Sequence, residues 1–365
     1  MALQFTTTAS TSPRSDAERA AVLAAPGFGK HFTDHMAVID WTVEDGWHDA
    51  RIQPYGPFSM DPASAVLHYS QEIFEGMKAY RREDGSVWTF RPDQNAERMQ
   101  RSARRIALPE LPTEDFVESL RQLVVADEAW VPTGGEDSLY LRPFMIANEV
   151  FLGVRAAETV LYSVIASPAG PYFPAGVKPV SIWLSREYAR AGKGGTGAAK
   201  TGGNYAASLL PTREAFANGC AQVLFLDESG DSNLEELGGM NVVLVKADGT
   251  LVTPQSESIL DGITRNSLLD IARDLGHAVE HRPVTLAEWR DGVASGDIVE
   301  SFACGTAAVI TPIAAIKAKD SADAFGDPDA PAGEVTMTLR TALTDLQYGR
   351  AADPHGWMTQ LTEAR

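Results

Sequence analysis

Proline and glycine crowd together in one stretch near the middle of the chain, residues 167–179 (SPAGPYFPAGVKP). Both residue types interrupt helices and strands, so such a cluster is typical of a linker. Strand-like apolar runs flank it, Thr159–Ala166 before and Val180–Leu184 after. Because 365 residues also favour more than one domain, the stretch predicts a two-domain chain. We expect an N-terminal arm at 1–29, a smaller domain at 30–168, an interdomain loop at 169–178 and a larger domain at 179–365.

Helical and strand patterns follow one another in mixed order on both sides of this linker. Apolar residues at helical spacing predict helices at 94–106, 113–129, 266–275 and 334–346. Alternation and short apolar runs predict strands at 138–147, 221–227, 240–245, 250–253 and, with a Gly-Thr break, 298–310. Strands and helices do not alternate regularly, which favours an α+β fold over a doubly wound sheet.

Charge and cysteine content exclude several classes of function. A formal net charge of −18 argues against a broad nucleic-acid or membrane surface, since both are polyanions. The only cysteines, Cys220 and Cys304, lie far apart, which indicates a reducing compartment without a disulfide framework. The sequence has no signal-peptide pattern and no apolar stretch of membrane-spanning length. We therefore expect a cytoplasmic protein with a frayed N-terminal arm.

One of only eight lysines, Lys200, lies in a glycine-rich run, Gly192–Ser208 (GKGGTGAAKTGGNYAAS). Glycine lets the backbone approach a ligand closely, and a lysine that forms a Schiff base needs a desolvated amine. A solvated lysine in a flexible loop is equally compatible with this run. A phosphate-binding loop of the G-x-x-x-x-G-K-[ST] type is disfavoured, because Ala199 replaces the second glycine and Gly202-Gly203 would break the helix that must follow.

Two turns of small residues are candidate anion sites. Gly262-Ile263-Thr264 precedes a predicted helix, whose first N–H groups could bind a phosphate, and Gly305-Thr306-Ala307 adds a hydroxyl. A plain helix cap or a tight turn explains each equally well. Arg98, in a row with Arg101 and Arg105, supplies a cation, although such rows are commonly solvated helix faces.

Charged residues near two predicted strands are further candidates. Glu236, or Glu235 on spacing alone, precedes an apolar strand, where a carboxylate could keep a pyridine ring nitrogen protonated. Arg142 shares a strand face with Tyr140 and Phe144, and a charge there needs a partner or a bound anion. Both an internal salt bridge and a carboxylate-bearing substrate remain open for Arg142.

Two histidine pairs have the i, i+4 spacing, His31/His35 and His277/His281. A metal site needs further ligands at a suitable spacing, and neither pair has a third. The H-E-x-x-H and G-x-S-x-G motifs are also missing from the sequence. We predict no metal site.

Several long blocks, in order along nearly the whole chain, resemble the branched-chain amino acid aminotransferases of fold type IV. They are LHYSQEIFEGMKAY at 67–80, FRPDQNAERMQRSA at 90–103, YLRPFMIANEVFLGV at 140–154, GGTGAAKTGGNYAAS at 194–208, EELGGMN at 235–241 and GTAAVITP at 305–312. The resemblance implies the two-domain architecture of this fold type, which D-amino acid aminotransferase shares, with the cofactor at the domain interface. It implies a transaminase that uses pyridoxal 5'-phosphate in two half-reactions. The amino group would move between L-leucine, L-isoleucine or L-valine and 2-oxoglutarate.

The resemblance also implies roles for individual residues. Lys200 would bind the cofactor as an aldimine and later move the proton. Tyr205 would contact the ring hydroxyl, Glu236 rather than Glu235 would face the ring nitrogen, and the phosphate would be held by Arg98, Gly262, Ile263, Thr264, Gly305 and Thr306. Substrate carboxylates would bind Tyr69, Arg142 and the backbone of Thr306-Ala307, beside an apolar pocket formed by Phe28, Phe74, Tyr140 and Tyr172. The loop with Leu152 and Val154 would enter the neighbouring subunit, which implies a homodimer.

The chain departs from this family at two places. Mammalian members carry a C-x-x-C pair after the Gly-Thr-Ala turn, but Ala308 and Thr311 occupy those positions here, so we predict no thiol–disulfide switch. Gly239 stands where some relatives have a threonine that touches the substrate carboxylate, which could shift substrate affinity. A D-amino acid aminotransferase or an aminodeoxychorismate lyase is the near alternative, and a catalytically silent binding protein is a more distant one. The FTDHM arm and the 140–154 block favour the branched-chain type.

Overall fold

The computed structural model describes residues 2–173, 175–228 and 232–364. Contacts between Cα atoms divide the chain into two compact units. Unit 1 comprises Met1–Pro174, Ala199–Gly202 and Leu346–Arg365, and unit 2 comprises Ala175–Ala198 and Gly203–Asp345. The units differ from the predicted domains in two segments, 199–202 and 346–365, which belong to unit 1. The domain boundaries placed from the sequence stay a prediction.

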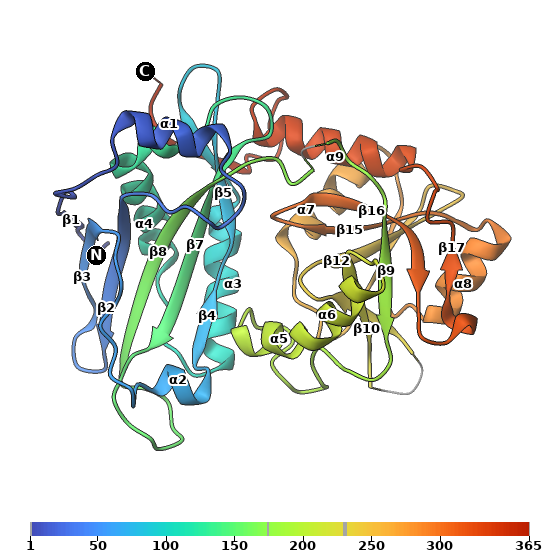
Figure 1. Cartoon of the computed structure of the whole chain (residues 1–365), viewed down its shortest axis with the longest axis horizontal. Coiled ribbons are helices and arrows are strands. Elements are labelled where there is room, and N and C mark those ends of the chain that lie inside the picture. Colours follow the sequence, from blue (N-terminus) through green and yellow to red (C-terminus); the bar gives the residue numbers. More distant parts are fainter. Residues whose placement is uncertain (1, 174, 229–231, 365) are drawn as a thin grey trace. The chain divides into compact units, whose positions relative to one another are not determined.

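A mostly antiparallel sheet, nine-stranded in the described residues, forms the centre of unit 1 (Figure 1). Its order is β1-β3-β2-β8-β7-β5-β6-β18, and β4 pairs with β7 off this path. The strands are β1 Thr6–Thr7, β2 His35–Thr42, β3 Gly46–Pro54, β4 Glu72–Phe74, β5 Met77–Arg81, β6 Val87–Phe90, β7 Ser138–Ala147, β8 Thr159–Ala169 and β18 Met358–Thr362. The last strand, β18, pairs with β6, which is why the C-terminal residues belong to this unit.

Helices α3 (Pro92–Arg105) and α4 (Thr113–Ala126) pack side by side against the sheet of unit 1 (Figure 1). Their buried positions recur at helical spacing, as in Met99 and Ala103 of α3, and join the main core. Both helices were predicted, the second one too long, because Glu128–Trp130 forms a separate 3₁₀ turn. Shorter helices lie at α1 (Asp16–Ala24) and α2 (Ala65–Tyr69).

Strand β7 changes its partner at a proline. The strand was predicted at 138–147 and has those bounds. Pro143 in its middle has no N–H to donate, and here the pairing passes from β5 to β4. Glu75 and Gly76 lie in the gap between these two strands, and the Glu75 N–H donates to the Pro143 carbonyl at 2.7 Å. The sheet is therefore interrupted at Glu75, a residue of the site described below.

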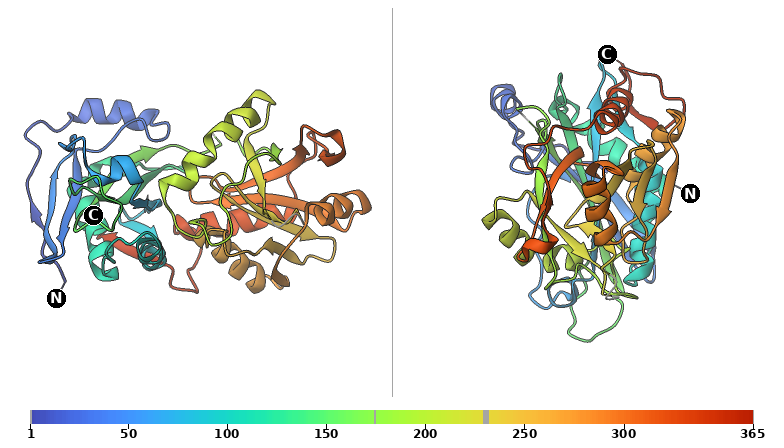
Figure 2. Two further views of the ribbon diagram at one scale, coloured as in Figure 1. Left: turned by 90° about the horizontal axis from the view of Figure 1, so that it is seen from below. Right: turned by 90° about the vertical axis from the view of Figure 1, so that its right-hand side faces the viewer.

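The N-terminal arm is not frayed, so that prediction was wrong. Thr6–Thr7 pairs in parallel with β3, and Figure 2 shows the arm (dark blue) along this edge of the sheet. The Ser10 N–H donates to His35 Nε2 at 2.9 Å, and the Leu3 N–H donates to the Asp115 carboxylate at 2.7 Å. The arm is held largely by its backbone groups, which a composition rich in Thr, Ser and Ala does not reveal.

Unit 2 contains a second sheet, also nine-stranded in the described residues, with the order β11-β10-β9-β16-β15-β12-β13-β14 and β17 beside β16. Its strands are β9 Val180–Ser185, β10 Gln222–Leu226, β11 Leu234–Leu237, β12 Asn241–Lys246, β13 Leu251–Pro254, β14 Val279–Arg282, β15 Ile298–Gly305, β16 Val309–Lys317 and β17 Phe325–Gly326. Its helices are α5 Gly202–Ala207, α6 Leu209–Ala217, α7 Ile263–Asp274, α8 Leu286–Ser295 and α9 Glu334–Gln347. Parallel pairs (β9 with β10 and β16, β13 with β14) mix with antiparallel ones, in keeping with the predicted α+β class.

Two boundaries differ from the sequence patterns. The first residues of the Pro/Gly-rich stretch 167–179 belong to a strand, because β8 continues to Ala169 through Pro168, which pairs with Leu139 of β7. The predicted run at 298–310 consists of parts of two strands, β15 and β16, joined by a turn at 306–308. Across the described parts of the chain, no helix is both long enough and apolar enough to span a membrane.

Candidate active site

Lys200 is held against unit 1 through its backbone. Its N–H donates to Ser102 Oγ of α3 at 2.9 Å, and its carbonyl accepts from the Phe74 N–H of β4 at 3.0 Å. The Nζ atom lies 4.8 Å from the centroid of the Phe74 ring, so the amine rests on an aromatic surface. Two residues later, the Gly202 N–H donates to the Glu72 carboxylate, where a Cβ atom would overlap the carboxylate oxygen. These contacts do not fit the alternative of a solvated lysine in a flexible loop.

Arg98, a predicted phosphate ligand, pairs with the fully buried Glu75. Its Nε donates to Oε1 at 2.8 Å and a terminal nitrogen donates to Oε2 at 2.7 Å, while Asn95 adds a bond to Oε2 at 2.7 Å. Burial opposes ionisation of Glu75, but the Arg98 charge and these hydrogen bonds outweigh it, so the pKa of Glu75 lies below its usual value. Arg98 thus has a structural partner, and its contact with a phosphate stays a prediction.

Arg142 forms no ion pair with any residue that the structure describes. A terminal nitrogen donates to Tyr140 Oη at 2.9 Å, and the guanidinium carbon lies 4.7 Å from the centroid of the Phe74 ring. Its Nε is buried without a hydrogen-bond partner among the described residues. Phe28 packs edge-on against Tyr140, with 4.9 Å between ring centroids. The internal salt bridge is therefore not formed within the described chain, and the arrangement suits a bound carboxylate beside an aromatic wall.

Tyr172, the fourth predicted wall residue, contacts a different aromatic side chain. Its ring packs edge-on against Phe173, at 4.9 Å between centroids. The side chain is about half exposed. Its place in a substrate pocket stays a prediction.

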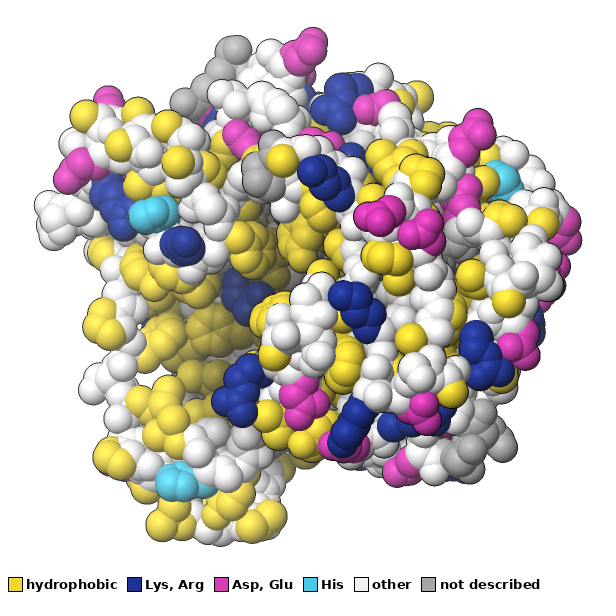
Figure 3. Space-filling view, turned by 45° about the vertical axis from the view of Figure 1, so that its right-hand side comes forward, with side chains coloured by type: hydrophobic (Ala, Val, Ile, Leu, Met, Phe, Trp, Pro, Cys, Tyr) yellow, Lys and Arg dark blue, Asp and Glu magenta, His cyan; other side chains and the backbone are white. Residues whose placement is uncertain are grey.

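The loop after β7 carries exposed apolar side chains. Leu152 and Val154 are 64% and 89% exposed, and Val150 is 57% exposed. Tyr69, at the end of α2, donates its hydroxyl hydrogen bond to the Leu152 carbonyl and so fastens the loop to that helix. In Figure 3, hydrophobic side chains gather at the lower left, over α2 and this loop. Tyr69 therefore supports the loop, and its predicted role toward a substrate carboxylate is not tested by this contact.

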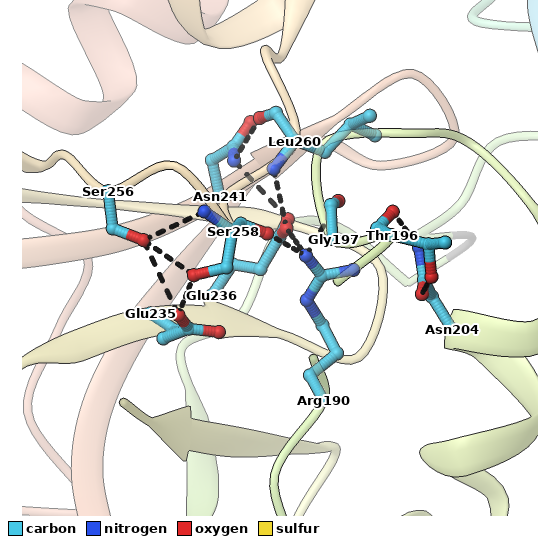
Figure 4. Close-up of polar contacts among 10 residues, drawn as sticks. All are labelled: Arg190, Thr196, Gly197, Asn204, Glu235, Glu236, Asn241, Ser256, Ser258 and Leu260. Carbon is cyan, nitrogen blue, oxygen red and sulfur yellow. Dashed lines mark hydrogen bonds and ion pairs between the residues drawn. The ribbon is translucent and has the colours of Figure 1, made fainter. Parts of the chain in front are cut away.

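In unit 2, Glu236 of β11 is buried beside Arg190, Asn241 and Leu260 (Figure 4). Its Oε1 forms an ion pair with a terminal nitrogen of Arg190, at 2.7 Å, and accepts a hydrogen bond from the Leu260 N–H at 2.8 Å. Its Oε2 accepts from the Asn241 side chain at 3.4 Å. A buried carboxylate that meets a guanidinium and a backbone N–H is stabilised in its ionised form.

Its neighbour Glu235 has different partners. Glu235 Oε1 accepts from the Ser258 hydroxyl and, at 3.4 Å, from the Ser256 hydroxyl, while Oε2 is buried without a partner in the described chain (Figure 4). Burial raises the pKa of Glu235. The two carboxyls that spacing alone could not separate thus have different partners: Glu236 forms the ion pair with Arg190, whereas Glu235 accepts from two serine hydroxyls and is influenced by the Arg190 charge without forming an ion pair with it.

Gly262 directly precedes helix α7 and packs against Asn241, the side chain that donates to Glu236. A Cβ atom at Gly262 would overlap Asn241 Oδ1, so glycine allows this close approach. Helix α7 begins at Ile263, and no side chain is recorded as its N-cap hydrogen-bond acceptor. The backbone N–H groups of its first turn, at Ile263 and Thr264, are therefore chemically suited to an anion.

The turn between β15 and β16 lies close to the end of β11. Gly305 approaches the Gly239 carbonyl, since a Cβ atom on it would lie 3.6 Å away. Gly239 in turn lies against Tyr205, with 3.6 Å between its Cβ position and the ring. Thr306 and Ala307 form the turn itself, and Val309 after it has φ of +62°, a strained value for a β-branched residue. Unit 2 thus brings Tyr205, Glu236, the α7 start and the 305–307 turn into one neighbourhood.

Sequence reasoning missed three residues of these two clusters, Glu75, Arg190 and Asn241. A signal existed for Glu75, because a charge inside the apolar run Ile73–Met77 needs a buried partner. Arg190 and Asn241 carried no comparable signal, since their roles depend on segments that pair only in the fold.

Comparison with known proteins gives one consistent result. Residues 72–316 match the family model described as amino-transferase class IV. The chain is 57% identical to the branched-chain-amino-acid aminotransferase of Mycolicibacterium smegmatis and 56% identical to that of Mycobacterium tuberculosis, in each case over 98% of both chains.

Solved structures agree. The branched-chain amino acid aminotransferase of Thermobaculum terrenum, solved in its PLP-bound holo form, has a TM-score of 0.70 at 25% identity, over 89% of this chain and 98% of that one. The Escherichia coli branched-chain amino acid aminotransferase has a TM-score of 0.70 at 27% identity, over 90% of this chain and all of that one. The fold is therefore that of the fold type IV aminotransferases. The chain belongs to the class IV aminotransferases and, within them, to the branched-chain-amino-acid aminotransferases.

Proposed function

We propose that this enzyme transfers the amino group between L-leucine, L-isoleucine or L-valine and 2-oxoglutarate, with Lys200 as its catalytic residue. Membership of the family makes the chain a pyridoxal-phosphate-dependent transaminase. When bound, pyridoxal phosphate supplies an electron sink that stabilises negative charge at the substrate Cα atom. The remaining tasks, which are binding, orientation and proton movement, belong to the chain's own residues.

The position of Lys200 is the observation that carries this proposal. Its backbone is fixed by Ser102 and Phe74, and its amine lies over the Phe74 ring. An amine must lose its proton and much of its hydration before it can attack a carbonyl, and an aromatic surface assists the second step. With its backbone fixed at both polar groups, Lys200 can move a proton through its side chain alone.

We assign the cofactor contacts of unit 2 by their chemistry. Glu236, held beside Arg190, would accept the hydrogen bond of a protonated ring nitrogen, and the Tyr205 hydroxyl would contact the ring oxygen. The phosphate would bind N–H groups at the start of α7 (Gly262, Ile263 and Thr264) and at the Gly305-Thr306 turn, with Arg98 as the predicted cation. Uncapped helix N–H groups, a turn hydroxyl and a buried carboxylate are a donor and acceptor set that fits pyridoxal phosphate.

The substrate contacts combine one cation with aromatic side chains. Arg142 has a buried Nε without a recorded partner and lies beside Phe74 and Tyr140, so it would bind a carboxylate at the edge of an apolar wall. Such a site can accept either an aliphatic chain or the second carboxylate of glutamate. Further predicted contacts come from Phe28, Tyr69, Tyr172 and the backbone of Ala307.

We also propose a cytoplasmic homodimer. Leu152 and Val154 are exposed apolar residues on a loop fastened by Tyr69, and such a loop is suited to enter a second copy of the chain. Cys220 and Cys304 are both free thiols, which agrees with a reducing compartment. The substrates are small molecules, and the net charge of −18 disfavours nucleic acid and anionic membranes as partners.

The proposal is tested by absorption spectroscopy of the purified protein with pyridoxal phosphate. We expect a visible band that bleaches with L-leucine and returns with 2-oxoglutarate, and little response to D-leucine. Borohydride reduction should fix the cofactor to wild type but not to the Lys200→Ala variant. A matched control is Lys193→Ala in the same glycine run, which should keep the covalent attachment.

Two results would contradict the proposal. Cofactor fixed to Lys200→Ala would place the attachment elsewhere. A wild-type band that bleaches with D-leucine and not with L-leucine would favour a D-amino acid aminotransferase.

A further inference from the structure

Arg190 is a buried arginine that no sequence motif singled out. It follows β9 and precedes the glycine-rich run, and it is 6% exposed. Its terminal nitrogen lies 2.7 Å from Glu236 Oε1, and both side chains of this pair are at least 95% buried. Figure 4 shows the guanidinium between Glu236 and Gly197. An arginine placed here can affect the cofactor ring through Glu236 without touching it.

We propose that Arg190 is the positioning residue that keeps Glu236 ionised and aimed, and so sets the protonation of the cofactor ring nitrogen. This inference rests on the proposed contact between Glu236 and that nitrogen. A carboxylate can accept the hydrogen bond of a protonated nitrogen, whereas a neutral carboxyl group can offer its own proton instead. The charge of Glu236 therefore decides which state of the ring is favoured.

Burial makes this charge depend on its surroundings. A buried carboxylate without a cation tends to become neutral, because desolvation disfavours the charged form. Arginine suits the task, since its guanidinium stays charged at any working pH. The Leu260 N–H and the Asn241 side chain fix the direction of Glu236, but both donors are neutral. Arg190 thus supplies a cationic contact to Glu236, at 2.7 Å.

The same guanidinium also holds two loops of unit 2. A terminal nitrogen donates to the Gly197 carbonyl at 2.9 Å and to the Ser258 carbonyl. A Cβ atom at Gly197 would overlap the Ser258 carbonyl oxygen, so the two backbones touch directly. The guanidinium of Arg190 therefore does two things at once: it pairs with Glu236, and it holds the glycine-rich run that leads to Lys200. A test must separate this structural contribution from the effect on charge.

Three changes separate the two contributions. Arg190→Met removes the charge and the loop contacts, Arg190→Lys keeps the charge but loses the planar fork, and Glu236→Gln removes the carboxylate charge alone. Arg186→Met is a control, because Arg186 is an arginine of unit 2 in an exposed pair with Asp323. If Arg190→Met yields no folded protein, Arg190→Gln takes its place.

The readouts are the dissociation constant of pyridoxal phosphate for the apoenzyme and the pH titration of the bound cofactor's visible band. We expect Arg190→Met to shift this titration as Glu236→Gln does, and to weaken cofactor binding about tenfold, as is common when the partner of a binding group is lost. Arg190→Lys should keep the wild-type titration midpoint. The double variant Arg190→Met/Glu236→Gln should titrate like Glu236→Gln alone.

A wild-type titration in Arg190→Met, with only weaker folding, would leave Arg190 a structural role and overturn the inference. So would an Arg190→Lys variant that titrates like Arg190→Met, because the charge would then not matter. A wild-type protein that binds no pyridoxal phosphate would instead refute the proposed function, before the variants are compared.

Discussion

The two units each bury an arginine–glutamate pair, and the pairs are built differently. In unit 1, Arg98 grips Glu75 with two nitrogens, at 2.8 and 2.7 Å, and Asn95 adds a third side-chain donor. In unit 2, the recorded ion pair between Arg190 and Glu236 uses one terminal nitrogen, which also faces two backbone carbonyls. The first pair is bidentate, with two hydrogen bonds between the side chains. The second is a single ion-pair contact, and its arginine donates its hydrogen bonds to backbone carbonyls instead.

This difference indicates different tasks. A bidentate pair fixes both partners in plane and saturates the carboxylate, as suits a structural joint between α3 and the gap in the sheet at Glu75. Glu236 has one ion-pair contact with a guanidinium nitrogen and accepts from a backbone N–H and, at 3.4 Å, from an amide side chain, so its direction is set by contacts of different kinds. We infer that Glu75 serves stability in unit 1, by holding Arg98, which stays the predicted phosphate cation, and that the pair in unit 2 serves the chemistry. Substitutions at three positions, Glu75, Gly262 and Gly239, test this inference.

The largest effect is expected for Glu75→Ala, which leaves the Arg98 charge buried without its carboxylate. Breaking a buried pair in this way costs about 3–5 kcal/mol of unfolding free energy. The control is Glu110→Ala, which removes an exposed partner of Arg104 and should cost about 1 kcal/mol or less. Urea denaturation of the apoenzyme measures both. Equal losses for the two variants would show that the Glu75–Arg98 pair is not a structural joint.

The stability contributed by the Glu75–Arg98 pair should also depend on pH, in a direction that the pKa of Glu75 determines. The pKa of Glu75 lies below its ordinary value of 4.5 in the folded state, so the pair stabilises the fold above pH 4.5. This contribution is lost as the pH falls through the lowered folded value. The stability difference between wild type and Glu75→Gln should therefore shrink between pH 7 and pH 3. A difference that stays constant over this range would mean that the ionised form of Glu75 is not what stabilises the fold.

A smaller effect is expected for Gly262→Ala in unit 2. The added Cβ would overlap Asn241 Oδ1 and displace the side chain that donates to Glu236. Overpacking of this kind costs about 1–3 kcal/mol, and we expect weaker pyridoxal phosphate binding as well. Gly56→Ala is a control, because nothing lies within 4 Å of its Cβ position. If Gly262→Ala behaved like this control in denaturation and cofactor titration, Asn241 would not support Glu236.

The sequence predicted elements whose pattern is local. The alternation of β7 and the helical spacing of α3 came close to their observed bounds, because one buried face repeats along each element. Short strands such as β4 and β18 were missed, since each depends on pairing with a distant segment. The arm was misjudged for the same reason.

The site residues, like the strands and helices, were predictable only where the signal lies within one segment of the sequence. The glycine-rich run marked Lys200, and the strand face marked Arg142, because both signals lie within one segment. Glu235 and Glu236 could not be separated by spacing alone, since the choice depends on what packs against each face of β11. Arg190 meets Glu236 across 46 positions of sequence, a contact that no local pattern encodes.

The smallest effect is expected for Gly239→Ala, a glycine at the other end of the unit 2 site. Its Cβ would lie 3.6 Å from the Tyr205 ring, an ordinary contact distance, and its φ lies outside the left-handed region. Where glycine is not required, alanine changes stability by only about 0.5 kcal/mol and can raise it, because the unfolded chain loses freedom. Thermal unfolding of the apoenzyme should therefore match wild type within that margin, and Gly239→Thr should also fold. A loss of stability as large as that of Gly262→Ala would show that Tyr205 packs more tightly on Gly239 than the structure indicates. Neither end of the site in unit 2 would then have room for an added methyl group.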